Sequence, residues 1–160
     1  MNNKSSEKSL IDYFDTVVKP TVEEFLKQQN DLRRARLACI VLYHTLDYIK
    51  YVPKIDIRYI TNDTDFIYVR DVCNATKHFK LKRNKVSRKI NSTEQIKYHP
   101  HMGGGLFTAP FGGATFDNSG IYVETNDHKD VCIMYSVSKI MKILEKEIST
   151  FREANNFLNK

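Results

Sequence analysis

The sequence predicts a mainly α-helical protein, a bundle of four helices with a small β element inserted between the third helix and the fourth. Apolar residues recur at spacings of three and four in four separate stretches, which is typical of helices with one buried face. All six glycines fall between positions 103 and 120, where a regular helix cannot form. A chain of 160 residues has the size of one domain, so we expect residues 1–160 to share a single core.

The first helix is expected to start at Ser9, a residue type that caps helix N-termini, and to run to Leu26. Pro20 has no backbone N–H to donate, so it should kink or split this helix. The helix has one apolar stripe, formed by Leu10, Phe14, Val17, Val18, Val22, Phe25 and Leu26.

The second helix is expected from Asn30 or Asp31 to about Tyr51, with Pro53 ending it. It carries two apolar stripes, so it should be the central helix, contacted from several sides. One stripe contains Leu32, Ala35, Cys39, Leu42, Leu46 and Ile49, and the other contains Leu37, Val41, His44 and Tyr48. We interpret His44 and Asp47, three residues apart, as a hydrogen-bonded core pair rather than an acid–base site.

The third helix is expected to be capped by Asn62, Asp63 or Thr64 and to reach about Leu81, with Phe79 in the core. Ser136 should cap the fourth, whose core-facing stripe is Val137, Ile140, Met141, Leu144, Ile148, Phe151 and Leu158. Amphipathic helices of this kind are not stable alone in water, so they should pack together as a four-helix bundle.

Residues 84–134 form the predicted insertion. Positions 84–98 alternate weakly and indicate an edge strand, and residues 121–124 and 131–134 flank a turn as in a β-hairpin. The glycine-rich loop 103–120 lacks the Gly-Lys-Ser/Thr ending of a phosphate-binding loop. Because it carries Leu106, Phe107, Phe111 and Phe116, we expect a flap or a surface for a protein partner.

Positive charge is concentrated in one run. The formal net charge is +6, and residues 77–89 hold seven basic residues and no acid: Lys77, Lys80, Lys82, Arg83, Lys85, Arg88 and Lys89. Lysine and arginine contacts to phosphate dominate non-specific affinity for nucleic acids, so this run is a candidate nucleic-acid-binding site. The alternative is that these cations only complement the dipole at a helix C-terminus and keep the surface hydrated.

The remaining composition indicates a cytoplasmic protein without a membrane span, a cofactor or a metal. Cys39, Cys73 and Cys132 lie in apolar surroundings and form no C-x-x-C pair, so we expect buried thiols in a reducing compartment. The N-terminus has no apolar signal region, and the longest apolar run is far shorter than the ~20 residues of a membrane helix. His99, His101, His128 and Cys132 do not match a known spacing of metal ligands.

One row of polar residues on the third helix has the parts for RNA cleavage. Arg70, Asn74 and His78 are four residues apart, which places them one above another on a helix, with Asp71 and Lys77 beside them. An arginine can hold a phosphate through two donors, and a histidine can transfer a proton at neutral pH. Metal-independent cleavage by the ribose 2′-hydroxyl needs such groups. The alternative is structural: these side chains hydrogen-bond one another and the glycine-rich loop.

The pattern Arg70-Asp71-x-x-Asn74-x-x-x-His78 resembles the motif of the HEPN superfamily, small helical bundles with an Arg and a His separated by about four to six residues. Residues 17–24 and 34–48 also look like uncharacterised bacterial or phage-borne HEPN-like proteins, so the resemblance covers about half of the chain. One departure is that seven residues separate Arg70 from His78.

The resemblance implies a metal-independent endoribonuclease that forms one composite cleft across a homodimer, in a toxin–antitoxin or anti-phage setting. In that hypothesis His78 is the acid or base, Arg70 holds the phosphate, Asn74 and Asp71 orient them, and the basic run binds RNA. The alternative hypothesis is a non-catalytic HEPN-like module that binds nucleic acid or, through loop 103–120, a protein.

Overall fold

A computed structural model describes residues 3–52, 55–56, 58–81, 88–99 and 120–158 of the chain. In chain order the elements are α1 (Asn3–Tyr13), the π-helical turn η1 (Phe14–Val18), α2 (Lys19–Lys27), α3 (Leu32–Ile49), α4 (Arg58–Asn62), α5 (Thr64–His78), the 3₁₀ turn η2 (Thr93–Gln95), β1 (Ile96–His99), β2 (Gly120–Glu124), β3 (Asp130–Cys132) and α6 (Ile133–Leu158). The protein is therefore mainly helical, with a small antiparallel sheet in the order β1-β2-β3.

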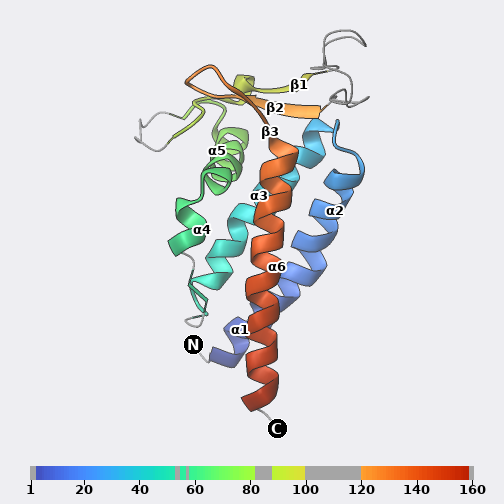
Figure 1. The fold of residues 1–160 in the computed structure, drawn as a ribbon, viewed down its shortest axis with the longest axis vertical. Coiled ribbons are helices and arrows are strands. Elements are labelled where there is room, and N and C mark those ends of the chain that lie inside the picture. Colours follow the sequence, from blue (N-terminus) through green and yellow to red (C-terminus); the bar gives the residue numbers. More distant parts are fainter. Residues whose placement is uncertain (1–2, 53–54, 57, 82–87, 100–119, 159–160) are drawn as a thin grey trace, which may run out of the picture.

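The long helices run alternately in opposite directions, and the sheet lies at the end where α5 finishes and α6 begins (Figure 1). Helix α3 packs against α1, α2, α5 and α6, which confirms its predicted central position. The core between these helices is apolar, and its largest fully buried side chains are Phe25, Phe66, Leu10, Leu42, Ile49, Ile60, Ile90, Ile121, Ile133, Ile140, Leu144 and Ile148.

The first helical segment differs from the prediction at its start. It begins at Asn3, so Ser9 is not an N-cap but lies inside α1, where its hydroxyl donates to the carbonyl of Ser5 at 2.9 Å. Pro20 does not split this helix as predicted. The helical backbone is continuous from α1 through the π-helical turn η1 into α2, and the missing N–H of Pro20 changes the ladder of hydrogen bonds without ending it. Val17 lies in this turn and is 37% exposed, so its predicted place in the apolar stripe is wrong.

The starts of α3 and α5 follow the predicted caps. The Asp31 carboxylate accepts a hydrogen bond from the backbone N–H of Arg34 at 3.0 Å, and that of Asp63 accepts from the N–H of Asp65 at 2.8 Å. Short α4 was not predicted.

Helix α5 ends at His78, three residues before the predicted end. Phe79 adopts φ 53, and its carbonyl accepts a hydrogen bond from the N–H of Thr93 at 2.9 Å, which turns the chain away from the helix. Its side chain is 56% exposed, so the predicted core position is wrong.

The predicted hairpin is present, with Glu124 opposite Asp130. An edge strand, β1, occupies the end of the predicted 84–98 segment. Helix α6 begins at Ile133, so Ser136 is not its cap: its buried hydroxyl donates to Asp65 Oδ1 at 2.6 Å. The glycine-rich loop lies outside the described residues except for Gly120, as do residues 53 and 101 and the side chain of residue 158.

The three cysteines are free thiols. Cys39 and Cys73 are buried as predicted, whereas Cys132 is half-buried. Burial raises the pKa of the Cys39 thiol well above its usual range. Across the described part of the chain, no helix combines the length and apolar character needed to cross a membrane.

Candidate functional site on helices α3 and α5

The predicted row on α5 is divided between two environments. Asp71 is only 2% exposed, and its Oδ1 accepts hydrogen bonds from Nε and Nη2 of Arg70, both at 2.9 Å. Its Oδ2 accepts from the backbone N–H of Lys89 at 2.6 Å. Asp71 therefore ties the chain that follows α5 back onto the helix, and Arg70 compensates the buried negative charge.

Asn74 and His78 have a different setting. Asn74 is half-buried, and His78 is exposed at the last position of α5. Within the described residues, neither side chain has a hydrogen-bond partner. The His78 imidazole is therefore accessible to a ligand from solvent.

The structure does not bring Arg70 and His78 to one point. Eight helical positions correspond to a rise of about 12 Å and a rotation of about 80° between the two residues. Arg70 is also held by the neighbouring Asp71, so in this arrangement the two side chains of one helix do not converge on a single phosphate. We therefore expect a site that uses both to need a second chain.

The basic run contributes exposed cations near the end of α5. Lys77 and Lys80 are exposed, and Lys80 Nζ lies 5.7 Å from the centre of the Phe79 ring. Arg88 and Lys89 are half-buried, and Arg88 Nη1 donates to the carbonyl of Leu81 at 3.2 Å. Lys82, Arg83 and Lys85 lie outside the described residues.

A chain of hydrogen bonds between α3 and α5 was not predicted. Asp47 Oδ2 lies 2.8 Å from His44 Nδ1, and the other ring nitrogen of His44, Nε2, contacts Lys77 Nζ. The side chains of His44 and Asp47 are 34% and 56% exposed, so the predicted core pair is wrong: the pair lies at the surface. We call this arrangement the Asp47–His44–Lys77 chain.

The two ring nitrogens of His44 have different partners. A lysine ammonium donates, so the arrangement fits an imidazole that accepts at Nε2 and carries its proton on Nδ1, facing Asp47. The hydrogen bonds from His44 and Lys50 hold the pKa of Asp47 below its ordinary value, so this carboxylate stays ionised. Cys73 lies beside Lys77, and burial raises the pKa of its thiol, which keeps it protonated at neutral pH.

A groove runs along the same seam between α3 and α5. Its volume is about 410 Å³, and it is lined by Leu32, Arg33, Arg36, Leu37, Ile40 and Thr76. Arg36 Nε and Thr76 Oγ1 are buried and have no hydrogen-bond partner among the described residues. Ile40 is one helical turn from His44, and Thr76 directly precedes Lys77, so the groove leads toward the Asp47–His44–Lys77 chain.

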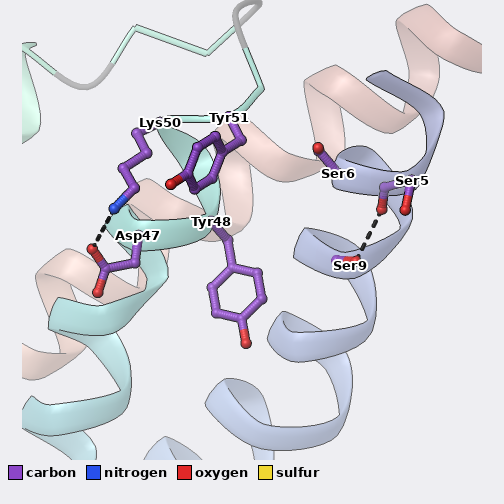
Figure 2. Close-up of a pocket in the computed structure, with 7 residues that line it drawn as sticks. All are labelled: Ser5, Ser6, Ser9, Asp47, Tyr48, Lys50 and Tyr51. Carbon is purple, nitrogen blue, oxygen red and sulfur yellow. Dashed lines mark hydrogen bonds and ion pairs between the residues drawn. The ribbon is translucent and has the colours of Figure 1, made fainter. Parts of the chain in front are cut away.

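A second pocket, of about 400 Å³, lies between α1 and the end of α3 (Figure 2). Three serines of α1, Ser5, Ser6 and Ser9, face Asp47, Tyr48, Lys50 and Tyr51 across it. Lys50 Nζ is held by Asp47 Oδ1 at 3.0 Å, and Ser9 donates to Ser5. The cation of this pocket is therefore already paired, so the pocket offers less to an anionic ligand than the seam does.

Among the described residues, no group of three or more His, Cys, Asp or Glu side chains could hold a metal ion. His99 packs edge-on against Tyr122, and His128 is exposed in the β2–β3 turn. No family model, curated protein or solved structure matches this chain.

Proposed function

We propose that this protein binds RNA through the basic end of α5, as a non-catalytic member of a HEPN-like group of four-helix bundles. The observation that carries the proposal is the group of exposed side chains Lys77, His78 and Lys80. They belong to a run, residues 77–89, that contains no acid. Because Asp71 is buried and paired with Arg70, the nearest carboxylate of α5 does not neutralise them.

Single-stranded RNA is the preferred ligand of such a surface. Exposed cations bind phosphates without reading sequence, and Phe79, more than half exposed between His78 and Lys80, supplies a ring on which an unpaired base can stack. Affinity should therefore fall steeply with salt and depend weakly on sequence.

Charge reversal at one position of this surface tests the proposal. Fluorescence anisotropy with a labelled single-stranded RNA measures Kd over a series of salt concentrations, in the presence of a metal chelator. Lys80→Glu should raise Kd about tenfold and reduce the slope of log Kd against log salt by about one to two. Lys142→Glu makes the same charge change at an exposed position of α6 and is the matched control. Equal effects of the two variants, or no binding by the natural protein, would overturn the proposal.

A second candidate is the metal-independent endoribonuclease that the Arg70 and His78 motif implies. The exposed, unpartnered imidazole of His78 within the described residues favours it, because such a group can exchange a proton with a substrate. Since Arg70 and His78 of one chain lie two turns apart, this candidate requires a homodimer in which one chain provides each group.

The second candidate is tested by oligomeric state and by cleavage. Sedimentation velocity should show a dimer at micromolar concentration, and His78→Gln should abolish cleavage in the presence of a chelator. Arg70→Ala is a poor probe because it also leaves the buried carboxylate of Asp71 unpaired, so Arg70→Lys is the better variant. A monomer, or cleavage that survives His78→Gln, would refute this candidate.

A further inference from the structure

We propose that the groove between α3 and α5 binds an acidic, amphipathic helix of a partner protein. The inference goes beyond RNA binding and does not depend on it, because the groove is lined by residues other than the exposed cations at the end of α5. Two observations carry it. The groove combines aliphatic side chains with two arginines that have no carboxylate beside them, and none of the described residues that line it is acidic.

The arginines of the groove differ from the other arginines of the described chain. Arg33 and Arg36 make no ion pair and no side-chain hydrogen bond with a described residue. Every other arginine that the structure describes has a carboxylate or carbonyl partner; these are Arg34, Arg58, Arg70, Arg88 and Arg152. Asp31, the acidic residue closest to the groove in the sequence, is already paired with Arg34. Two positive charges of the groove are therefore left for a ligand to pair with.

Arg36 is positioned before a ligand arrives. Its side chain is half-buried, and its Nε is covered by protein although no described group accepts the hydrogen. Thr76 Oγ1, which lines the groove from α5, is in the same state. A buried polar atom without a partner costs free energy, and a carboxylate in the groove can recover that cost through charge-assisted hydrogen bonds. The groove therefore favours a ligand that carries carboxylates.

The spacing of the lining residues fits a helix. Leu32, Leu37 and Ile40 supply the apolar surface, and Leu37 is 38% exposed. The row from Leu32 to Ile40 covers about two helical turns, or about 12 Å, and Arg33 and Arg36 are about one turn apart. A partner helix with apolar side chains at i, i+3 or i+4 and i+7, and with carboxylates one turn apart beside them, matches both sets.

A protein helix matches this lining better than RNA or a purely apolar ligand. No aromatic side chain is among the described residues that line the groove, so a base has no ring on which to stack. A purely apolar ligand would cover the two arginines without giving them a counter-charge, which is unfavourable. An acidic amphipathic helix supplies aliphatic contacts and counter-charges together, and interfaces of this kind are enriched in arginine.

A synthetic peptide tests the proposal with the purified full chain. The probe is a fluorescein-labelled peptide of about 14 residues, or about four helical turns, with leucines on one face and glutamates beside them. Fluorescence anisotropy measures its Kd. Arg33→Ala and Arg36→Ala should each raise Kd at least about fivefold, because each removes a charge-assisted contact. Arg58→Ala removes an exposed arginine on α4 and is the matched control, which should leave Kd unchanged.

Two altered peptides test the two parts of the groove separately. Replacing the glutamates by lysines, or the leucines by serines, should raise Kd more than about tenfold. Leu37→Ser in the protein should weaken binding of the glutamate peptide in the same direction. Absence of binding of the glutamate peptide, or equal binding of the glutamate and lysine peptides, overturns the inference. If Arg36→Ala does not fold, as judged by its melting curve, the exposed Arg33 decides through Arg33→Ala.

The same variants, titrated with single-stranded RNA, separate this inference from the proposed function. Arg36→Ala should keep the Kd for RNA within about twofold, whereas Lys80→Glu should weaken RNA binding and keep the Kd for the peptide within about twofold at physiological salt. RNA affinity that falls in Arg36→Ala, without specific binding of the glutamate peptide, would assign the groove to the RNA surface and overturn the inference alone. Peptide binding without RNA binding would support the inference and overturn the proposed function alone.

Discussion

Replacing Asp71 by alanine is expected to lower the stability of the fold, because it breaks a buried ion pair on α5. The carboxylate is 2% exposed and holds three donors: Nε and Nη2 of Arg70 at 2.9 Å and the N–H of Lys89 at 2.6 Å. Removing it leaves the Lys89 amide without its acceptor and the Arg70 guanidinium without the carboxylate beside it. The chain after α5 also loses its attachment to the helix.

The size of the loss follows from these contacts. Breaking a buried ion pair by removing one partner costs about 3–5 kcal/mol. The side chain of Arg70 is 22% exposed and can be partly rehydrated, which places the expected loss near the lower limit, about 3 kcal/mol. For a chain of this length such a loss lowers Tm by about 6–12 °C.

Urea unfolding, followed by circular dichroism, measures this loss. Asp71→Asn retains an acceptor oxygen but not the charge, so its loss in free energy of unfolding should be smaller than that of Asp71→Ala but not zero. Asp12→Ala removes an exposed carboxylate on α1 that has no side-chain contact among the described residues, so it should change the free energy of unfolding by less than about 0.5 kcal/mol. A loss below about 1 kcal/mol in Asp71→Ala would show that the Asp71 contacts do not hold the segment.

Three further outcomes follow from contacts elsewhere. Ser136→Ala should lower the free energy of unfolding by about 1–2 kcal/mol, because it removes the buried hydrogen bond to Asp65; an unchanged urea midpoint would contradict this. Phe79→Gly should raise stability by about 1 kcal/mol, because an exposed phenylalanine at φ 53 is strained and glycine is not; a lower Tm would refute the strain. The hydrogen bond from His44 lowers the pKa of Asp47, so the carboxylate stabilises the fold above its ordinary pKa and this contribution disappears as the pH falls through the lowered value. Melting curves of Asp47→Asn and the natural protein should therefore differ at neutral pH and converge in acid; a constant difference would refute the linkage.

The fold was predictable where the signals are local. The caps Asp31 and Asp63 each bond to a backbone N–H two or three residues away, so the start of α3 and of α5 can be derived from the sequence. Ser136 has the same chemistry, but its hydroxyl bonds to Asp65, 71 residues away. The sequence alone could not distinguish this tertiary contact from a cap.

The end of α5 shows the same limit. Apolar spacing continues through Phe79 to Leu81, and it predicts a longer helix. The chain turns because Phe79 O accepts a hydrogen bond from the N–H of Thr93 and the N–H of Leu81 donates to the carbonyl of Asn91, two contacts with a segment at least ten residues away. Hydrogen bonds to distant residues can end a helix before its apolar spacing ends, and the spacing itself does not show where this happens.

Only part of the candidate site could be predicted from the sequence. The spacing of His44 and Asp47 indicated a hydrogen-bonded pair, and Lys77 was part of the basic run. Their connection depends on the packing of α3 against α5, which brings residues 33 positions apart into contact. An exposed His–Asp pair beside a lysine of another helix is accessible to solvent, whereas a buried pair is not. The sequence does not show which of the two applies, because exposure depends on how α3 and α5 pack.

Helix α5 makes two polar contacts with different roles: the buried ion pair of Arg70 with Asp71, and the exposed contact of Lys77 with His44. Arg70 and Asp71 hold the segment that contains Lys89 against the helix, so the charge of Arg70 is used inside the protein. Lys77, by contrast, contacts His44 of α3 and remains exposed at the surface. It follows that Asp71 variants should lower the melting temperature, whereas variants of the exposed His44 should change it little. Asp71 lies on α5 and His44 on α3, and the two share no hydrogen-bond partner among the described residues, so the effects on stability should add in the double variant.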